Sequence, residues 1–308
     1  MKYAIISDIH GNLPAFEAVL EDAKNKQVDS YILLGDYAVC LPWGNEVVDL
    51  IRGLESTYII KGNQEDYLIK ADKQDKEQWN RQQYKPLCYA YNSLTPDNRT
   101  FLFNLPNELE IIDNDVVINV IHRTEIFNRP KKIALFHSYS YRLLYDENPD
   151  IVNHYNDLAC EAILTCPEAL NEIESLAEGV YLFAHSHLQF EMEYKGRHFI
   201  NPGSVSIPLD GNNTLSYSIL EISDSGINIE NQRLEYDYKA VIKKLYESDY
   251  YQLAPFWCQL IKKEMETGLE YIVPFLIHLE KMNEGYGEPG QPASDEVWHM
   301  AVKAWQGV

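Results

Sequence analysis

The first sixty residues alternate between short apolar runs and one-sided helical patterns. Strands are predicted at Lys2–Ser7, Ser30–Leu34 and Thr57–Lys61, where short apolar runs are bounded by glycine or polar residues. Helices are predicted between them, at Leu13–Lys26 and Glu46–Leu54, because apolar side chains recur there at helical spacing. This alternation favours an α/β unit with parallel strands.

Polar residues directly follow each of these three predicted strands. Asp8 and His10 come after the first strand. Asp36 ends a Gly-Asp pair after the second strand, and Asn63 ends a Gly-Asn pair after the third. Because ligands of open α/β sheets bind beyond the carboxyl ends of the strands, we expect these four side chains to lie close together.

The middle of the chain continues the strand pattern after an inserted polar segment. Residues from about 72 to 107 are polar and mostly helical in pattern, which predicts an insertion packed over one edge. Further strands are predicted at Val116–Ile121, Lys132–Phe136, Val180–Ala184, Gln189–Ile200 and Ser216–Ile222. His137 follows the second of these runs, and His185 and His187 follow the third.

The last quarter of the chain has a different, helical pattern. We therefore divide the chain into a domain of residues 1–233 and a helical C-terminal extension of residues 234–308. Aromatic side chains at helical spacing in the extension predict a packing surface, against the core or against a second subunit in a homo-oligomer. A cap over the substrate is the alternative interpretation.

The composition is that of a globular protein. Hydrophobic residues are 45% of the chain and charged residues 24%, which excludes a disordered or collagen-like chain. The five cysteines contain no CxxC pair, a pattern that favours reduced packing residues. The apolar run at the start is too short for a signal peptide, and no later run reaches the roughly twenty apolar residues of a membrane span. We therefore expect a cytoplasmic protein.

The charge balance limits the partners. Lys and Arg number 26 against 47 Asp and Glu, a formal net charge of −21. A surface of this sign repels duplex nucleic acid and anionic membranes, so neither is expected as a partner. A small phosphorylated substrate can still bind where metal cations reverse the local field.

Seven side chains at or just after predicted strand ends carry the candidate chemistry: Asp8, His10, Asp36, Asn63, His137, His185 and His187. Carboxylates, imidazoles and an amide oxygen without thiolates suit divalent ions such as Mn, Fe or Zn. Seven ligands exceed the need of one ion, so we expect two divalent metal ions. A pair about 3.5–4 Å apart, bridged by a carboxylate, would bind substrate oxygens and turn a bridging water into hydroxide for in-line attack on phosphorus.

Each of these residues alone also has an ordinary structural interpretation. Asp8 fits a cap of the following helix, for which Asn12 is also a plausible N-cap. Asp36 and Asn63 stand in dipeptides typical of turns, and His137 alone fits a loop histidine. A strand also puts alternate histidines on one face whatever their purpose. The ordered combination is far more specific than any single member.

Six segments strengthen this interpretation by their order. IISDIHGNLPAFEAVLEDA, LLGDYAV, IIKGNQED, LFHS, AHSH and INPGSVS occur in sequence over about residues 1–222. Together they resemble the motifs of the calcineurin-like metallophosphoesterases, most closely the bacterial branch of small phosphodiesterases and diadenosine-tetraphosphatase relatives. The resemblance implies a four-layer α-β-β-α sandwich, in which two mixed sheets are flanked by helices.

The resemblance also implies a set of metal ligands and a supporting turn. The implied ligands are Asp8, His10 and His187 for the first ion and Asn63, His137 and His185 for the second, with Asp36 bridging both. The residues expected to take part in catalysis are Asp36, Asn63, Gln64 and His137. Residues 201–204, Asn-Pro-Gly-Ser, resemble the family's turn beside the site, where we expect structural support.

Gln64 departs from the family pattern, in which many relatives have histidine at this position. That imidazole is often assigned to protonating the leaving group, whereas an amide can only hydrogen-bond. A phosphate leaving group, with a second pKa of about 6, needs less help than an alkoxide, so we hypothesise a bias toward anhydrides or activated diesters. His122, His154 and a metal-bound water are the alternative proton donors.

The function expected from these residues is hydrolysis of phosphodiester or phosphoanhydride bonds in small nucleotide or dinucleoside polyphosphate substrates. A phosphomonoesterase and a Ser/Thr-type protein phosphatase share the metal chemistry and are the alternatives. Such protein phosphatases typically retain the histidine that Gln64 replaces. A non-catalytic scaffold on the same fold usually sheds ligands, whereas all seven positions here hold competent residues.

Overall fold

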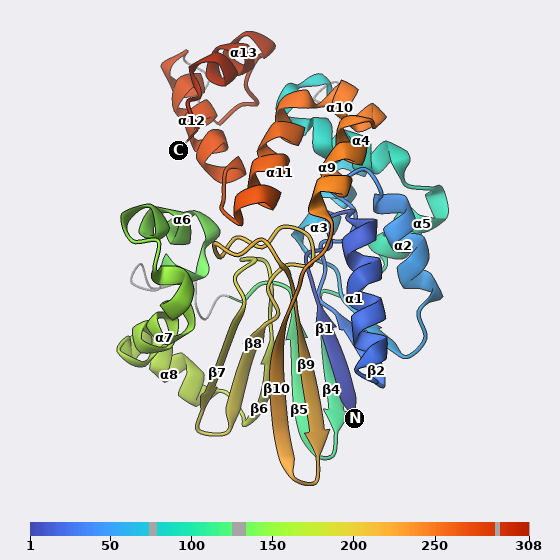
Figure 1. Ribbon diagram of the computed structural model, residues 1–308, viewed down its shortest axis with the longest axis vertical. Helices are drawn as coiled ribbons and strands as arrows, with labels where there is room; N and C mark the ends of the chain where they lie inside the picture. Colours follow the sequence, from blue (N-terminus) through green and yellow to red (C-terminus); the bar gives the residue numbers. More distant parts are fainter. Residues whose placement is uncertain (74–78, 125–133, 287–289, 308) are drawn as a thin grey trace.

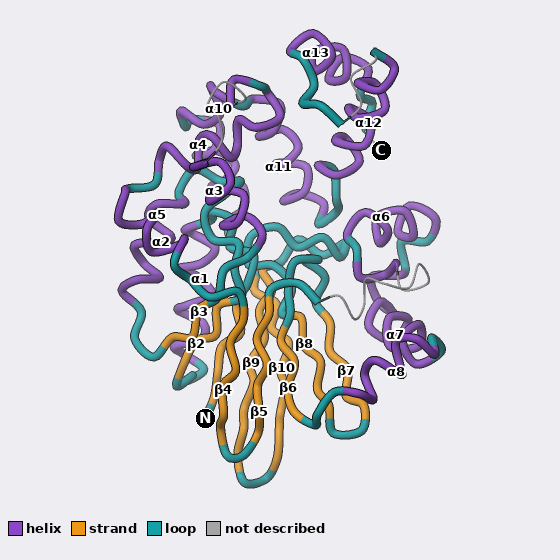
Figure 2. The backbone as a smooth tube through the Cα atoms, turned by 180° about the vertical axis from the view of Figure 1, so that it is seen from behind, coloured by secondary structure: helices purple, strands orange, loops and turns teal. Residues whose placement is uncertain are grey.

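Two five-stranded mixed sheets face each other, with helices on their outer sides (Figures 1 and 2). The computed structural model describes residues 1–73, 79–124, 134–286 and 290–307. Apolar side chains from both sheets form one buried cluster, which includes Ile5, Ile32, Val120 and Leu182. The sandwich with four layers that the sequence predicts is therefore confirmed.

Sheet 1 contains the three N-terminal strands and a late hairpin. Its strands are β1 (Lys2–Ile6), β2 (Ser30–Leu33), β3 (Thr57–Ile59), β9 (Leu215–Ser223) and β10 (Gly226–Leu234). They lie in the order β10-β9-β1-β2-β3. As predicted, β1, β2 and β3 are parallel, while β9 is antiparallel to β1. The buried Ile and Leu runs of β1 and β2 suit central strands that are covered on both faces.

Sheet 2 is built from the middle of the chain. Its strands are β4 (Glu108–Asp113), β5 (Val116–Ile121), β6 (Gly179–Leu182), β7 (Phe190–Tyr194) and β8 (Arg197–Asn201), in the order β4-β5-β6-β8-β7. The inner three strands β5, β6 and β8 are parallel, and β4 and β7 close the edges in the antiparallel sense. The carboxyl ends of β5 and β6 therefore meet at one edge of the sheet.

Helices cover the outer face of each sheet. On sheet 1 lie α1 (Leu13–Asn25) and α2 (Gly44–Gly53), through a buried cluster that contains Phe16 and Val48. Asn12 caps α1 as predicted, because its side-chain oxygen accepts a hydrogen bond from the Ala15 amide at 3.3 Å. On sheet 2 lie α6 (Ser138–Glu147), α7 (Ile151–Leu164) and α8 (Pro167–Ser175).

The segment that follows β3 is helical, as its pattern predicts. It forms α3 (Asn63–Lys73), the 3-10 helix η2 (Gln82–Tyr84), α4 (Lys85–Ser93) and α5 (Pro96–Phe103). Asn63 and Gln64 are the first two residues of α3. The third strand therefore delivers them directly to the edge at which β1 and β2 also end.

The C-terminal extension lies over the carboxyl ends of the strands (Figure 1). Its helices are α9 (Tyr238–Tyr246), α10 (Asp249–Leu253), α11 (Pro255–Thr267), α12 (Ile272–Gly285) and α13 (Asp295–Ala304). Leu260, Ile261 and Phe275 of the extension belong to the same buried cluster as Phe136 and Leu209 of the domain. Both parts therefore share one hydrophobic core.

The structure differs from the sequence prediction around residues 132–136. Lys132 lies outside the described residues, and Ala134–Phe136 forms the 3-10 helix η3 instead of the end of a strand. Phe136 packs edge-on against Phe190, with ring centroids 4.7 Å apart, so this apolar run anchors a turn to sheet 2. Apolar runs this short are ambiguous from the sequence alone.

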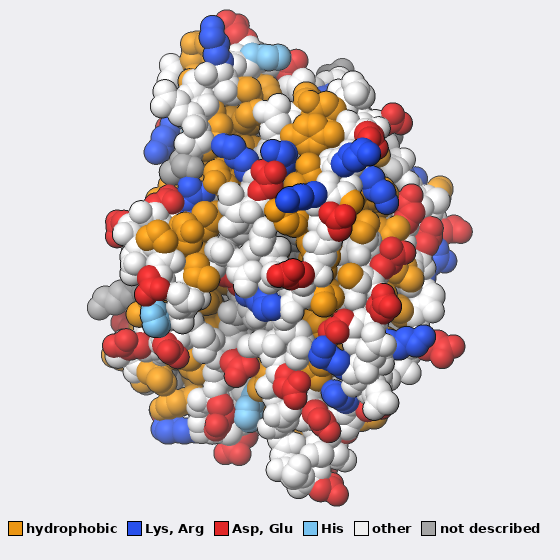
Figure 3. All heavy atoms as spheres, viewed as in Figure 1, with side chains coloured by type: hydrophobic (Ala, Val, Ile, Leu, Met, Phe, Trp, Pro, Cys, Tyr) orange, Lys and Arg blue, Asp and Glu red, His pale blue; other side chains and the backbone are white. Residues whose placement is uncertain are grey.

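One face of the molecule carries charged side chains of both signs. On the face in Figure 3, acidic and basic side chains are interspersed with uncharged ones. No helix in the described parts of the chain is long and apolar enough to cross a membrane. All five cysteines are free thiols, as expected from their spacing.

Candidate metal centre

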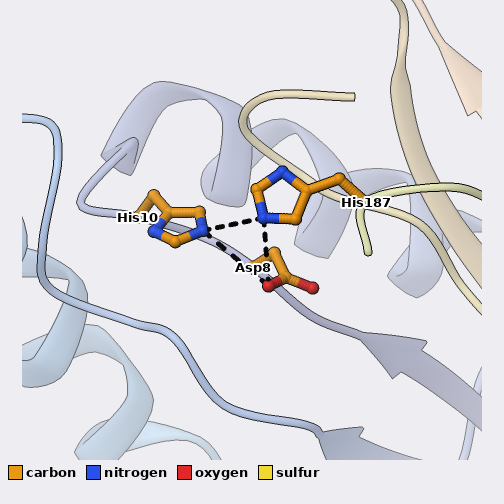
Figure 4. A group of neighbouring side chains, drawn as sticks. All are labelled: Asp8, His10 and His187. Carbon is orange, nitrogen blue, oxygen red and sulfur yellow. Dashed lines mark hydrogen bonds and ion pairs between the residues drawn. The ribbon is translucent and has the colours of Figure 1, made fainter. Parts of the chain in front are cut away.

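Asp8, His10 and His187 form the first group of candidate metal ligands (Figure 4). The Nε2 atoms of the two histidines are 3.1 Å apart, and Oδ1 of Asp8 lies 3.3 Å from Nε2 of His187 and 3.7 Å from Nε2 of His10. Asp8 and His10 follow β1 of sheet 1, whereas His187 follows β6 of sheet 2. The group therefore joins the two sheets.

The hydrogen bonds of the first group indicate a cation. Nδ1 of His10 faces the Val39 carbonyl at 3.1 Å and Nδ1 of His187 faces the Ile207 carbonyl at 2.7 Å. A carbonyl can only accept, so each Nδ1 carries the hydrogen and each neutral ring turns a lone pair on Nε2 toward the other. Both carboxylate oxygens of Asp8 are also buried without a hydrogen-bond donor. These unsatisfied acceptors fit a bound metal ion.

Asp36, His122 and His185 form the second group, with their ligand atoms within 4.8 Å of one another. Nε2 of His122 lies 3.0 Å from the Asn63 side-chain oxygen, and Nδ1 of His122 donates to the Leu34 carbonyl at 2.6 Å. Burial alone would lower the pKa of His122, but the Asp36 carboxylate outweighs it and raises this pKa to about 10. A cation next to Asp36 and Asn63 would take the place of that proton.

Asp36 belongs to the second group and also faces the first. Its Oδ2 atom is 3.9 Å from Nε2 of His10 and 3.6 Å from Nε2 of His122. Its Oδ1 atom accepts a hydrogen bond from the Gln64 backbone amide at 2.8 Å. One carboxylate oxygen is thus held by the backbone while the other faces both groups, as a bridging ligand requires.

His137 is not part of either group. The side chain is exposed, and the residue lies at the N-terminal end of α6. It lines the cavity beside the two groups without joining either of them. His122 holds the position that the sequence analysis gave to His137. His122 follows the predicted strand Val116–Ile121 directly, so the rule that identified the other ligands also applies to it. The sequence analysis considered His122 only as a proton donor; the other such candidate, His154, is exposed on α7 and pairs with Asp150.

The backbone is strained at the candidate ligands. Positive φ angles occur at Asp8 (54°), His10 (50°), Asp36 (59°), His185 (71°) and His187 (60°). This left-handed region is uncommon for residues other than glycine and costs of order 1–3 kcal/mol for each residue, so the surrounding hydrogen bonds must hold it in place. The concentration of such angles here points independently to a functional site.

Glu65 fixes the loops that carry Asp36 and Asn63. Its carboxylate is fully buried and accepts three backbone hydrogen bonds, from Asp36 at 2.9 Å, Tyr37 at 2.9 Å and Gly62 at 2.8 Å. Burial, followed by the charge of Asp36, raises the pKa of Glu65 to about 7. The sequence analysis missed this residue, because an acidic residue in the first turn of a helix looks like an ordinary surface residue.

The turn at residues 201–204 supports the site, as predicted. Asn201 donates from its side chain to the Ala184 carbonyl at 3.2 Å and to the Ser186 hydroxyl at 3.0 Å, on either side of His185. The Ser204 hydroxyl donates to the Asp8 carbonyl at 2.9 Å. This turn therefore connects the loop after β6 to the loop after β1.

Members of both groups line a cavity of about 360 Å³, and its wall includes four residues of the extension, two of which, Glu264 and Glu270, are acidic. Glu264 of α11 and Glu270 of the following loop are 2% and 4% exposed. Glu264 accepts backbone hydrogen bonds from Tyr271 and Ile272, both at 2.9 Å, and Ser138 donates to Glu270 at 2.7 Å. Burial, together with the charge of Glu270, raises the pKa of Glu264 well above its usual range.

The comparisons with known proteins agree with this chemistry. Residues 1–225 match the calcineurin-like phosphoesterase superfamily domain, and the chain belongs to that superfamily. The superfamily implies a metal-dependent phosphoester hydrolase, and the two groups of Asp and His fit a metal centre. An uncharacterized protein of Methanocaldococcus jannaschii is 32% identical over 256 residues, which cover 82% of this chain and 94% of that protein.

Two solved structures share the fold. A metallophosphoesterase from Sphaerobacter thermophilus superposes with a TM-score of 0.61 at 23% identity, over 87% of this chain and 99% of that one. A hypothetical protein from Pyrococcus horikoshii superposes with a TM-score of 0.59 at 16% identity, over 87% of this chain and 98% of that one. At these identities the likeness supports the fold alone.

Proposed function

We propose that this protein is a phosphoesterase with two divalent metal ions that hydrolyses phosphodiester or phosphoanhydride bonds in small nucleotide-type substrates. The observation that carries this proposal is the position of Asp36, whose Oδ2 atom lies within 4 Å of a histidine from each group, at 3.9 Å and 3.6 Å. A bridging carboxylate of this kind is the distinguishing part of a two-metal hydrolytic site.

Seven residues would hold the metal pair. We assign Asp8, His10 and His187 to one ion and Asn63, His122 and His185 to the other, with Asp36 between them. Such a pair supplies positive charge to phosphoryl oxygens and makes water more acidic. The chain itself fixes the ligand geometry, because the Nδ1 hydrogens of three of the histidines are held by backbone carbonyls.

The surroundings of the pair favour a good leaving group. Gln64 lines the cavity and its side chain cannot donate a proton as an acid does. Phosphate and phenolate leave with less help than an alkoxide, which supports the preference for anhydrides and activated diesters over alkyl monoesters. Phosphomonoesterase activity is the alternative that a substrate panel separates.

The test is a panel assay with a matched pair of variants. Diadenosine tetraphosphate, an aryl diester and a sugar monophosphate are compared in the presence of Mn, with bound metal measured on the purified protein. We expect turnover of the anhydride and the diester, and a loss of at least about 100-fold in Asp36→Asn, because outer-shell changes alone typically cost 10–100-fold. Asp150→Asn, at an exposed position, is the control.

Three results would contradict the proposal. Full activity in Asp36→Asn would exclude a bridging role for this carboxylate. A clear preference for the sugar monophosphate would replace the diesterase and anhydride assignment with a monoesterase one. Metal binding without turnover of any substrate would instead favour the scaffold.

A further inference from the structure

A second cavity opens directly beside the metal cavity. Its volume is about 380 Å³, and Cys40, Gln64, Tyr67 and Ile272 line both cavities. Pockets of roughly this size, a few hundred Å³, hold small organic ligands in many proteins. A ligand bound at the metal centre could therefore extend into this second cavity without crossing solvent.

The walls of the second cavity differ from those of the metal cavity. They come mainly from α3, η2 and α4 and from the helices of the C-terminal extension, and most of the side chains are aromatic or aliphatic. The principal wall residues are Tyr84, Leu87, Tyr250, Trp257, Ile261 and Leu276. Planar aromatic walls of this kind suit a flat ring, which stacks on them with favourable contact area.

The wall of the second cavity includes Tyr250, whose hydroxyl group lacks a hydrogen-bond acceptor in the part of the chain that the structure describes. Tyr250 is 1% exposed, and its hydroxyl group has no hydrogen-bond partner within the described residues. A buried hydroxyl without a partner is costly, so a ligand acceptor that came within reach of it would be favoured. A hydrocarbon chain or a plain phenyl ring offers none, whereas the ring nitrogens of a heterocycle do.

A cation lies near the junction of the two cavities. Nζ of Lys70, in the wall of the second cavity, is 5.6 Å from the ring centroid of Tyr67, which lines both cavities. A positive charge there suits a phosphorylated ligand that spans the two cavities.

We propose that the second cavity is the subsite for the nucleoside part of the substrate, holding the base between the C-terminal extension and the inserted helices while the phosphate lies at the metal centre. This inference rests on the proposed function for the position of the phosphate, and it names the substrate class. It gives the extension a part in substrate recognition, in addition to its packing role.

The test measures binding without catalysis. Adenosine and ribose are titrated by calorimetry into the full-length protein after treatment with a chelator, so that no turnover is needed. We expect adenosine to bind at least about tenfold more tightly than ribose, in line with stacking of a base on aromatic walls. Tyr250→Phe should weaken adenosine binding about threefold to tenfold, because it removes one hydrogen bond.

Two substitutions that fill the cavity from opposite walls provide the decisive comparison. Leu276→Trp on α12 and Leu87→Trp on α4 should each bring the ratio of adenosine to ribose affinity close to 1. Leu158→Trp, on the exposed face of α7, is the matched control and should leave the ratio unchanged. Circular dichroism confirms that each variant is folded, and two filling variants allow for failure of one. Equal affinity for adenosine and ribose in the wild type, or an unchanged ratio in a folded filling variant, overturns the subsite.

A kinetic comparison separates this inference from the proposed function. With Mn bound, a nucleoside 4-nitrophenyl phosphate diester should have a kcat/KM at least about tenfold above that of methyl 4-nitrophenyl phosphate, since both release the same phenolate. Adenosine binding without hydrolysis of either diester would refute the proposed function and leave the subsite standing. Equal hydrolysis of both diesters would refute the subsite and leave the proposed function standing.

Discussion

The choice between His122 and His137 as a ligand of the second metal ion can be decided by a pair of alanine substitutions. The His122 ring lies 3.0 Å from the Asn63 side-chain oxygen and 3.6 Å from the Asp36 carboxylate, whereas the His137 side chain is exposed. We therefore expect His122→Ala to lower metal occupancy from two ions to about one. His137→Ala should retain both ions.

The magnitude follows from what His122 contacts. Outer-shell residues of metal sites typically account for 10–100-fold in affinity or activity, and a direct ligand should exceed that range. We expect His122→Ala to lower kcat/KM at least about 100-fold, equivalent to about 2.7 kcal/mol of transition-state stabilisation, and His137→Ala to lower it less than about tenfold. His154→Ala, at an exposed ion pair, serves as the control.

The assay combines metal analysis of the purified variants with hydrolysis of an aryl diester in Mn. Because the His122 ring also donates to the Leu34 carbonyl, circular dichroism and thermal unfolding are needed to separate a lost ligand from a lost fold. Loss of one metal ion in folded His137→Ala, together with full occupancy in His122→Ala, would refute the assignment made from the structure.

Three further substitutions test the surroundings of the site. Glu65→Ala should lower the free energy of unfolding by about 3 kcal/mol or more in a denaturant titration, because three buried backbone amides lose their acceptor at about 1–3 kcal/mol each. Gly62→Ala should release metal in an equilibrium dialysis, because the added Cβ would collide with the Asp36 carboxylate. Glu264→Gln should raise the melting temperature of the metal-free protein at pH 8 but not near pH 4. The folded-state pKa of Glu264 is raised, so the stability it contributes is complete below its unfolded pKa and is lost as the pH increases. A melting temperature that is unchanged at pH 8 would contradict this sign.

The sequence predicts the part of the site that local order determines. Asp8, His10, Asp36 and Asn63 each follow an apolar run within the first 63 residues, and parallel packing of consecutive strands brings such positions together. The Asn12 cap was predictable for the same reason, since the residue and its acceptor role lie within one turn of the chain.

The same reasoning could not decide whether His122 or His137 is a ligand of the second metal ion. His122 and His137 both follow short apolar runs, and only the pairing of distant strands decides between them. In the structure Val120 of β5 pairs with Leu182 of β6, and the Ala184 amide donates to the His122 carbonyl at 2.9 Å, which places His122 beside His185. Contacts between residues 62 positions apart cannot be predicted from periodicity alone.

The contribution of the extension to the wall of the metal cavity could not be predicted from the sequence either. Glu264 and Glu270 lie in a segment whose pattern indicates amphipathic packing helices, and acidic residues are common on such helices. Only the tertiary fold turns these two side chains toward the metal cavity, because the nearest candidate ligand along the chain, His187, lies 77 residues before Glu264.

Because each group of candidate ligands takes residues from both sheets, a bound metal pair would also cross-link the two sheets. Asp8, His10 and Asp36 belong to one half, while His122, His185 and His187 belong to the other. Because the complete ligand set exists only in the folded sandwich, metal binding would raise the free energy of unfolding. Loss of the metal ions would lower the stability of the fold.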